Sequence, residues 1–566
     1  MQIVTPKQMG KIEDSSENLG VSKKQLMANA GKKLAEFIEN YFKVNEIPEP
    51  ENKSIVFLAG AGNNGGDCFA SARELVYKGY GITVINVIGE PKTNISSDMF
   101  NMLPDRVNII TGYTDDDTKV LIKEKENEYN EMSQTLTIEQ LSKKDSLTPL
   151  ESAVLNEKIR NEKIRSAIVS ADVLVDGVFG TGFHGQLDRE ISQIFSIGTS
   201  AYKIAVDVPS GGESYSGTAS DNTFKADETL ALGFIKTGMT QYPLKSYCGK
   251  ITVADIGIPV HAMEAIDGKR KYFRIERNQL ANFPPSREKN SHKGTYGKVL
   301  VIAGSSSMRG ASAFAVLGAL RSGTGLVQLA STEKCIDTVS VLAPEAIFVQ
   351  LASDENGFML FEPNKEKLLK AMENANAVVI GCGMGHTDDT CKITKFVTQN
   401  AKCPVLIDAD GINCIASDIE ILTQKNTDII ITPHMGEMAR LAGCDINMIA
   451  ENRFLAAEKY AEQFEITVIL KGAGTIISNG KTTAANHTGN PGMSRGGSGD
   501  ILSGIIGSII AQGYNVFDAS CAGVYIHGLA GDACAERLGQ EAMLPRDIID
   551  SLSESFMLLK EKHRIN

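Results

Sequence analysis

The glycine-rich stretch GNPGMSRGGSGD, residues 489–500, combines backbone that is nearly free of side chains with one carboxylate, Asp500. Five glycines in twelve residues let backbone N–H groups approach an anion closely. The apolar run ILSGIIGSII that follows predicts a helix, whose amino end would add the positive end of its dipole. Such a loop can hold a phosphoryl group while Asp500 accepts the proton of a reacting hydroxyl. The alternative is a tight turn with Asp500 as the helix N-cap.

A second short motif, KGAGT at residues 471–475, ends a predicted strand 25 residues before GGSGD. Its Lys471 and its backbone suit the distal part of a nucleotide, although KGxGT alone is also compatible with a hairpin turn. No GxxxxGK[ST] pattern is present, so phosphate chemistry would depend on these two loops. Asp408 and Asp410 in IDADGIN are candidates for binding a metal or steadying the site, and Asp410 equally for a turn.

The first half of the chain carries NNGGD at residues 63–67, inside a GxGxxG pattern. As a dinucleotide fingerprint this pattern is a weak signal. Two more strand ends, VDGVFGTGFHG (175–185) and VDVPSG (206–211), each add an acid and further polar groups. An amide carbonyl, a carboxylate and a hydroxyl meeting at one point would form a hard-oxygen site for an alkali or alkaline-earth cation.

Short β-branched runs, each followed by a turn and a helix-like segment, must position these motifs. Runs that are apolar on both faces are typical of central parallel strands, and the alternation predicts an α/β fold with two doubly wound domains. Ligands of such sheets bind at the carboxyl ends of strands, where the glycine-rich turns fall. The predicted strands lie in 54–60, 82–89, 171–180, 203–211, 229–238, 297–305, 324–331, 376–385, 403–411, 427–437 and 466–475.

The length of 566 residues exceeds what one core usually serves, which also predicts two domains. The strand pattern stops and restarts around residue 275, in a charged stretch that contains prolines. We therefore expect domains at 1–270 and 275–566. Residues from about 117 to 165 are polar, lack glycine and predict a solvated helical insertion in the first domain.

The net charge of −12 comes without a basic stripe, which argues against nucleic acid as a partner. No apolar run is long enough for a membrane helix, and the first residues lack the layout of a signal peptide. The ten cysteines show no CxxC pair and no Cys/His metal spacing, so we expect buried free thiols in the cytoplasm.

The second-half motifs, with HKGTYGKVLVIAGS (292–305), SGTGLV (322–327) and TPHMGEMARL (432–441), resemble the ribokinase-like superfamily. Within it they resemble the ADP- or ATP-dependent NAD(P)H-hydrate dehydratases over nearly all of 275–566. The resemblance implies a ribokinase-like sandwich that uses ADP, with ATP as the alternative, together with Mg²⁺. It implies phosphorylation of hydrated NADH or NADPH followed by elimination of phosphate, with Asp500 as the base.

The same resemblance implies the residues of two binding sites. The nucleotide site would comprise Lys471, Gly472, Ala473, Gly474, Thr475, Asn490, Pro491, Gly492, Met493, Ser494, Arg495, Gly496, Gly497, Ser498 and Gly499. The hydrated dinucleotide would face Gly325, His434, Met435, Gly436, Glu437, Met438, Ala439, Arg440 and Asp500.

The first-half motifs resemble the NAD(P)H-hydrate epimerase domain, a Rossmann-like sandwich, over about 20–260. The resemblance implies a potassium ion at Asn64, Asp176 and Ser210, and Asp207 is the candidate acid/base group. Substrate contacts would come from Asn63, Asn64, Gly65, Gly66, Asp67, Gly180, Thr181, Gly182, Phe183, His184, Gly185, Gln186 and Asp207.

Together these two resemblances imply a bifunctional NAD(P)H-hydrate repair enzyme. Its first domain would interconvert R- and S-NAD(P)HX, and its second would convert the S form to NAD(P)H, AMP and phosphate. We expect NADHX and NADPHX as its small-molecule partners, neither nucleic acid nor membrane, and a homo-oligomer. Three alternatives stay open: a ribokinase-like vitamin or sugar kinase with a non-catalytic N-terminal domain, a nicotinamide-dependent dehydrogenase that uses GxGxxG, and a non-catalytic nucleotide-binding regulator.

Overall fold

The structure is a computed structural model that describes residues 1–45, 52–266, 270–280, 283 and 287–561. The chain divides into two compact units, an N-terminal unit Ile3–Gly268 and a C-terminal unit Lys269–Asn566 that also includes Met1–Gln2. This division falls close to the boundary expected near residue 275. Pro284 and Pro285, the prolines of the charged stretch at the expected boundary, lie outside the described residues.

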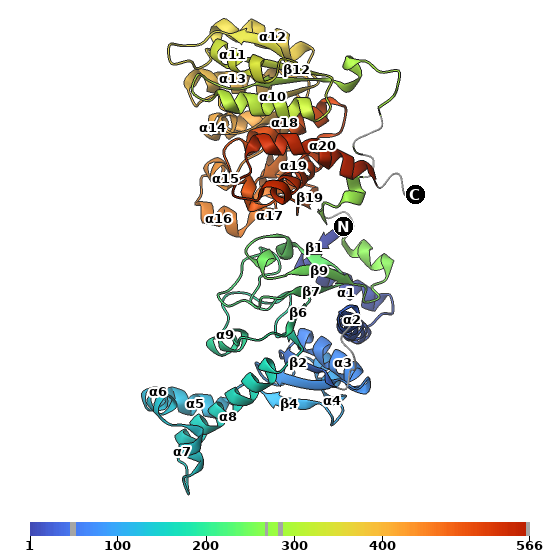
Figure 1. Ribbon diagram of the computed structural model, residues 1–566, viewed down its shortest axis with the longest axis vertical. Coiled ribbons are helices and arrows are strands. Elements are labelled where there is room, and N and C mark those ends of the chain that lie inside the picture. Colours follow the sequence, from blue (N-terminus) through green and yellow to red (C-terminus); the bar gives the residue numbers. More distant parts are fainter. Residues whose placement is uncertain (46–51, 267–269, 281–282, 284–286, 562–566) are drawn as a thin grey trace. The chain divides into compact units, whose positions relative to one another are not determined.

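The N-terminal unit is built on a parallel sheet with the strand order β4-β3-β2-β5-β6-β7-β9 (Figure 1). The strands are β2 (Ser54–Ala59), β3 (Gly81–Asn86), β4 (Asn108–Thr111), β5 (Val173–Gly177), β6 (Tyr202–Val206), β7 (Glu228–Leu232) and β9 (Lys250–Ala254). From β2 the chain continues to one edge of the sheet through β3 and β4, and from β5 it continues to the other edge through β6, β7 and β9. The carboxyl ends of these two strands therefore form the topological switch point, where doubly wound sheets bind ligands.

Helices cover both faces of this sheet, because successive residues of a strand point to opposite sides. Phe57 packs in a core with α2 and α3, whereas Leu58 packs in a core with α8 and α9. The helices are α1 (Pro6–Asn18), α2 (Lys23–Val44), α3 (Asn63–Tyr77), α4 (Asn94–Asn101) and α9 (Arg189–Phe195). Outside the sheet, the short strand β1 (Gln2–Val4) pairs in parallel with β8 (Ile235–Lys236).

Four helices occupy the segment for which the sequence predicts a helical insertion, between β4 and β5. They are α5 (Asp116–Glu124), α6 (Glu126–Thr135), α7 (Ile138–Ser142) and α8 (Pro149–Val169). Tyr129, Leu141 and Val154 belong to a small apolar cluster that the insertion forms by itself. Only the end of α8, at Ile164 and Ile168, joins the core beneath the sheet.

The C-terminal unit contains a mainly parallel sheet with the order β13-β12-β11-β14-β15-β16-β17-β18-β19-β10 (Figure 1). Only β18 runs antiparallel to its neighbours. The strands are β10 (Lys271–Arg274), β11 (Lys298–Ile302), β12 (Leu326–Thr332), β13 (Ile347–Leu351), β14 (Ala377–Ile380), β15 (Val405–Ile407), β16 (Ile429–Ile431), β17 (Thr467–Leu470), β18 (Ile476–Ser478) and β19 (Thr482–Ala485).

Both faces of this sheet are buried as well. Val299 and Val301 share a core with α10, α18, α19 and α20, and the intervening Leu300 is also fully buried. The helices are α10 (Arg309–Arg321), α11 (Glu333–Leu342), α12 (Lys365–Glu373), α13 (Asp388–Asn400), α14 (Asp410–Ala416), α15 (Met435–Ala442), α16 (Ile446–Glu451), α17 (Arg453–Phe464), α18 (Ser498–Ala511), α19 (Val516–Leu538) and α20 (Pro545–Glu561). The α/β prediction with large parallel sheets is confirmed.

Two further predictions are confirmed at this level. The run ILSGIIGSII forms most of the buried helix α18. All ten cysteines are free, and only Cys391 and Cys444 are partly exposed. Among the helices of the described residues, none is long and apolar enough to span a bilayer.

Candidate functional sites

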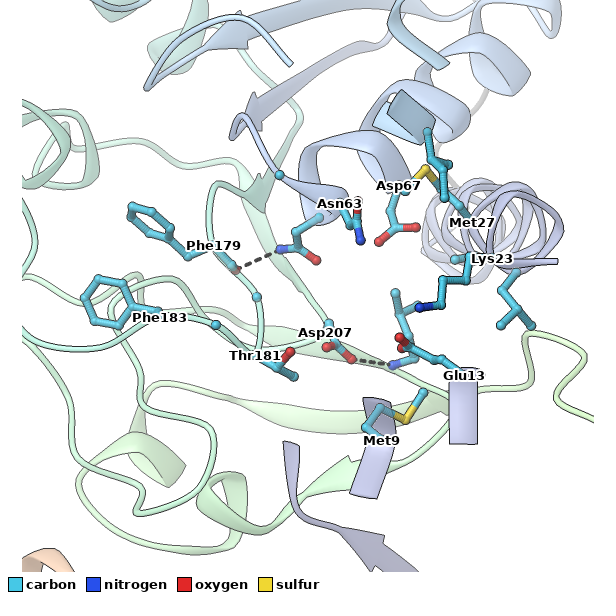
Figure 2. A pocket seen from close by; sticks show the side chains of 18 of the residues that line it. Met9, Glu13, Lys23, Met27, Asn63, Asp67, Phe179, Thr181, Phe183 and Asp207 are labelled. Carbon is cyan, nitrogen blue, oxygen red and sulfur yellow. Dashed lines mark hydrogen bonds between the residues drawn. The ribbon is translucent and has the colours of Figure 1, made fainter. Parts of the chain in front are cut away.

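The N-terminal unit contains a cavity of about 450 Å³ at the carboxyl ends of β2, β5 and β6. Backbone and side chains of Asn63, Asn64 and Gly180 form the side nearest the switch point. Helices α1 and α2 supply the opposite side, which includes Glu13, Lys23 and Met27 (Figure 2). The sequence motifs predicted only the first of these two sides.

A buried ion pair lies in this cavity. Lys236 Nζ binds Asp207 Oδ1, and the Lys236 side chain is only 1% exposed. Asp207 also accepts a hydrogen bond from Leu232 N at 3.0 Å, and Lys236 donates to Leu232 O at 3.0 Å. Asp207 has a φ of 66°, a left-handed conformation that is costly for a residue with a side chain. Strain of this kind concentrates at functional positions, where the surrounding structure must hold it in place.

Two further carboxyl groups share the cavity with Asp207. Burial, and then the charge of Asp207, raise the pKa of Glu13. The same two causes, together with Glu13, raise the pKa of Asp67 well above its usual range. Figure 2 shows the carboxyl groups of Glu13, Asp67 and Asp207 facing the same space. The site therefore combines two carboxyls of raised pKa with a carboxylate that is paired to an ammonium, the kind of contrast that separates acid from base.

A group of oxygen atoms lies beside the cavity, around Asp176. Ser210 donates to Asp176 through its backbone N (2.8 Å) and through Oγ (2.6 Å). Ser210 Oγ is also 3.2 Å from the peptide oxygen of Phe179, to which Asn64 Nδ2 donates at 2.8 Å. Burial raises the pKa of Asp176 to about 6, although the hydrogen bonds from Ser210 and Val178 oppose this. The structure thus brings Asn64, Asp176 and Ser210 together.

In the C-terminal unit, the carboxylate of Asp408 follows β15 and is 1% exposed. It accepts hydrogen bonds from Lys471 Nζ (2.6 Å) and Thr432 Oγ1 (2.7 Å) at one oxygen, and from Ser503 Oγ (2.7 Å) at the other. Burial alone would raise its pKa, but Lys471 and the hydroxyl donors hold the pKa of Asp408 below its usual value. Asp408 therefore stays ionised and fixes the ammonium of Lys471.

Asp500 lies next to this ion pair, in the first turn of α18. Oxygen atoms of Asp500 and Asp408 and the Sγ of Cys382 lie within 4.8 Å of one another. Burial, and then the negative charge of Asp408, raise the pKa of Asp500 to about 7. A carboxyl group with a pKa near the working pH is suited to proton transfer.

The two glycine-rich loops meet at this point. A Cβ placed on Gly499 would lie 3.4 Å from Lys471 Nζ, and Gly497, the N-cap of α18, has a φ of 102°. The helix amino end, the bare backbone and the lysine thus converge beside Asp500. This arrangement can bind a phosphate group and present it to a hydroxyl whose proton Asp500 accepts.

Comparisons with known proteins agree with this division of the chain. Residues 299–554 match the family model described as NAD(P)H-hydrate dehydratase, and residues 23–238 match the model described as YjeF-related protein N-terminus. A bifunctional NAD(P)H-hydrate repair enzyme Nnr from Moorella thermoacetica is 30% identical over 99% of this chain and 98% of its own. The chain belongs to the family of bifunctional NAD(P)H-hydrate repair enzymes.

Two other relatives show the same similarity over parts of the chain. The Nnr repair enzyme of Escherichia coli K12 is 32% identical over 68% of this chain and 71% of its own. The crystal structure of the ADP/ATP-dependent NAD(P)H-hydrate dehydratase of Bacillus subtilis, co-crystallized with ATP/Mg²⁺, is 28% identical; it covers 50% of this chain and 97% of its own, with a TM-score of 0.44.

In this repair-enzyme family member, most predicted contacts of the N-terminal site do line the cavity. They are Asn63, Asn64, Asp67, Gly180, Thr181, Gly182, Phe183 and Asp207. Gly65 and Gly66 instead pack tightly, since an added Cβ would lie 2.0 Å from Gly60 O and 2.6 Å from Met27 Sδ, respectively. Nor do His184, Gly185 and Gln186 belong to the cavity lining: His184 is 3.4 Å from Glu213, and Gln186 accepts a hydrogen bond from Ser220.

The predicted nucleotide loops are held by residues outside them. Arg453 Nη1 donates to Ala473 O at 2.7 Å, and burial lowers the pKa of this arginine to about 10.

In the second loop, Asn490 Nδ2 donates to Gly531 O and to Asp532, whereas Arg495 binds Glu541 O. Ser498 Oγ lies 3.4 Å from Nε2 of His527, whose pKa burial lowers to about 4. The remaining members lie within the same two loops: Gly472, Gly474, Thr475, Pro491, Gly492, Met493, Ser494 and Gly496.

The segment from His434 to Arg440 lies beside the lysine loop, because His434 and Lys471 form a parallel β-bridge. The His434 ring caps α15 by accepting hydrogen bonds from Gly436 N and Glu437 N, so it has a structural role. Met438 and Ala439 point into the core, with exposures of 0% and 7%. Only part of this segment is therefore available to a ligand, namely His434, Met435, Gly436 and Arg440.

Gly325 is not brought to this site. It precedes β12 and therefore lies at the amino edge of the sheet, whereas Asp408 follows the carboxyl end of β15. Its neighbour Thr324 hydrogen-bonds Ser508, eight residues or about 12 Å along α18 from Asp500. An added Cβ on Gly325 would collide with Lys293 O at 1.7 Å, so close backbone packing explains this glycine.

Several side chains of both sites lie outside the sequence motifs. Lys236 follows an apolar strand run directly, which is the one sequence signal that could have flagged it. Glu13 and Arg453 lie on amphipathic helices, where polar residues are ordinary. The loop GCGMG after β14 carries Cys382, and its Gly385 N donates to Asp410 at 2.8 Å. Its three glycines in five residues were a usable signal.

Proposed function

We propose that this chain repairs hydrated NADH and NADPH with two activities. The C-terminal site would convert S-NAD(P)HX and ADP to NAD(P)H, AMP and phosphate, with ATP as the alternative donor. The N-terminal site would interconvert the R and S forms. The observation that carries the proposal is the position of Asp500, between a glycine-lined helix amino end and Lys471.

Dehydration needs a better leaving group than hydroxide. In the proposed reaction the oxygen of the ring hydroxyl attacks the terminal phosphorus of the nucleotide while Asp500 accepts the proton of that hydroxyl. The bond between this phosphorus and the rest of the nucleotide breaks. Phosphate then leaves from that carbon and a proton leaves from its neighbour, which restores the ring double bond. Lys471, held by Asp408, and the backbone N–H groups of residues 496–499 would stabilise charge on the transferred group.

Magnesium is proposed to enter with the nucleotide. Asp408 Oδ1 accepts two hydrogen bonds, whereas Oδ2 accepts one from a hydroxyl, that of Ser503. Asp408 and Asp500, whose oxygens lie within 4.8 Å of each other, are therefore the carboxylates that would contact the ion. Phosphate oxygens and water are the usual ligands of Mg²⁺ in such sites, with few protein groups. When bound, the ion would neutralise negative charge on the phosphates.

Epimerisation requires a bond to the hydrated carbon to break and to re-form on the other face. In either route, ring opening or transient loss of water, one group must supply a proton and another must accept it. We propose Asp207 as the acceptor, oriented by Lys236, and the neighbouring carboxyl of Glu13 or Asp67 as the donor. Both donors have raised pKa values, which keeps the proton on them at higher pH.

A potassium ion is proposed beside this cavity. The oxygens of Phe179 and Val206 lie 2.8 and 3.1 Å from Asn64 Nδ2, and Asp176 and Ser210 add carboxylate and hydroxyl oxygens. These carbonyl, carboxylate and hydroxyl oxygens are suitable ligands for a hard cation that does not require a strict coordination geometry. The buried carboxyl of Asp176 has hydrogen-bond donors but no charged neighbour among the causes of its shifted pKa, and a cation would supply the missing charge. When bound, it would fix the loop that follows β5.

Replacing K⁺ by a bulky organic cation is expected to slow consumption of the R form severalfold and to leave conversion of the S form unchanged. In Asp176→Asn, a neutral side chain of the same shape, the response to K⁺ should disappear. Chiral chromatography of the R and S forms over time measures both rates. Equal R-form consumption with and without K⁺ would contradict the proposed site.

One assay tests the function as a whole. The chain is incubated with hydrated NADH and either ADP or ATP, while nicotinamide absorbance and released phosphate are recorded. We expect one phosphate per NADH recovered. A kinase would accumulate a phosphorylated product, a dehydrogenase would not respond to the nucleotide, and a regulator would yield neither phosphate nor NADH.

The net charge of −12 supports small-molecule substrates over nucleic acid. The cytoplasmic location, the absence of a membrane partner and the homo-oligomeric state remain predictions.

A further inference from the structure

Three metal-ligating side chains meet in the C-terminal unit outside the proposed nucleotide site. They are His386, which follows the glycine loop after β14, Cys391 in the first turn of α13, and Cys414 in α14. One ring nitrogen and the two sulfur atoms all lie within 4.8 Å of one another. Sequence spacing does not show this cluster, because 4 and 22 residues separate its members.

We propose that His386, Cys391 and Cys414 bind a Zn²⁺ ion, which clamps the loop after β14 to α13 and α14. Two thiolates and an imidazole are ligands that zinc prefers, whereas hard ions such as Mg²⁺ prefer oxygen. Zinc bonds of about 2.0–2.3 Å place neighbouring ligands somewhat under 4 Å apart. Closing the cluster around the ion therefore requires movements of about 1 Å or less, given the present 4.8 Å limit.

Hydrogen bonds already hold the three ligand-bearing segments together. Thr390 Oγ1, next to Cys391, donates to Gly385 O at 2.8 Å, and Cys414 Sγ lies 3.8 Å from that same hydroxyl oxygen. Gly385 N, next to His386, donates to Asp410 Oδ2 at 2.8 Å, at the start of the helix that carries Cys414. A binding site whose framework is fixed before the ion arrives loses little entropy on binding.

Burial gives the cluster a closed side and an open side. Cys414 is buried, Cys391 is partly exposed and His386 is exposed. Both cysteines are free thiols, so both sulfur atoms can bind a metal. The exposed side at His386 gives the ion a way in and leaves a fourth position for water, as three-ligand zinc sites have.

The position of the cluster suggests what the clamp would hold. Cys382, four residues before His386, is the residue whose sulfur contacts Asp408 at 3.8 Å. The ion would therefore restrain the loop that borders the Asp408–Asp500 group. Binding itself depends only on the three ligands, so it can be tested without any enzyme assay.

The test is a titration of the full chain with Co²⁺, a coloured substitute for Zn²⁺, after removal of metals and under anaerobic reducing conditions. We expect thiolate-to-cobalt charge-transfer bands and the visible bands of tetrahedral Co²⁺ to saturate at one equivalent and to vanish when Zn²⁺ is added. Zn²⁺ should also raise the midpoint of thermal unfolding. Cys391→Ala and His386→Ala should weaken Co²⁺ binding at least about tenfold, as loss of even an outer-shell partner can.

Cys444→Ala is the matched control, because Cys444 is equally a partly exposed free thiol but lies outside the cluster. It should keep the full cobalt spectrum and the thermal shift. Circular dichroism establishes that each variant is folded before titration. Absence of charge-transfer bands in the parent chain, or their persistence in folded Cys391→Ala, would overturn the proposal and would leave the proposed repair activities unaffected.

Discussion

Asp500→Asn is expected to lower nucleotide-dependent conversion of S-NADHX by about 10²- to 10⁴-fold, the usual contribution of a positioned general base. The amide cannot accept the hydroxyl proton, although it keeps the shape of the carboxylate at the start of α18. Nucleotide affinity should survive, because Lys471 and the backbone of residues 496–499 are unchanged. Stopped assays of NADH recovery and a separate nucleotide-binding titration measure the two quantities independently.

Asp550→Asn is the control for this variant, since Asp550 is an exposed aspartate on α20 of the same unit. It should retain parental turnover. Parental turnover in Asp500→Asn as well would refute the role given to Asp500. Loss of nucleotide binding together with turnover would instead indicate that the carboxylate belongs to the binding site.

The pH profile of the parent chain adds a second measurement of Asp500. The base must be ionised, and its pKa is raised to about 7, so kcat/KM for dehydration should rise with pH and level off above about 7. At neutral pH a larger fraction of Asp500 is protonated than of an ordinary aspartate, because its pKa is raised. Lowering the pH below about 7 should therefore already reduce the rate of dehydration. The epimerisation rate, which does not involve Asp500, should lack this limb.

The second large effect is expected for Asp207→Asn, which should abolish accelerated consumption of R-NADHX and leave conversion of the S form intact. Asparagine is among the residues that best tolerate the left-handed backbone of this position, so the local conformation should persist. The substitution leaves the ammonium of Lys236, 1% exposed, without its carboxylate. Breaking one side of a buried pair costs about 3–5 kcal/mol, so the N-terminal unit should also become less stable.

Two further variants separate chemistry from stability. The double variant Asp207→Asn/Lys236→Met removes both charges and should recover much of the lost stability without recovering R-form consumption. Asp221→Asn, at an exposed aspartate of the same unit outside the cavity, should behave as the parent. Parental consumption of the R form by either Asp207 variant would exclude Asp207 as the acid/base group.

Much of the fold was predictable because its signal is local. Each of the eleven predicted apolar runs contains a strand of one of the two sheets, and the glycine-rich turns follow those strands as expected. The strands that escaped prediction in the sheets, β4, β9, β10, β13, β18 and β19, are mostly half-exposed or short. β4, β9 and β13 lie at the edges of their sheets, where a strand needs less apolar surface and its sequence resembles that of a loop. β18 and β19 are buried inside the sheet, but they are only three and four residues long.

The candidate sites were predictable to a smaller degree. Motifs pointed to Asp207, Asp500 and the loops around them, because positions where the backbone must approach a neighbour closely require glycine. The same reasoning misplaced Gly325, whose missing side chain makes room for the backbone at Lys293 rather than for a ligand. Sequence alone does not distinguish these two reasons for a glycine.

Local sequence was enough to predict the α/β class, the two glycine-built loops and the acids that follow them, since backbone conformation and hydrophobic period are properties of neighbouring residues. Tertiary structure decided which side chains act on one another. Asp408 hydrogen-bonds Lys471 and Ser503, which are 63 and 95 residues away in the sequence. Asp207 pairs with Lys236, which is 29 residues away, and His386 lies beside Cys414 of α14 although the whole of α13 separates them in the sequence. The pKa of Asp500 follows from such contacts, because burial and the charge of Asp408 exist only once the chain has folded.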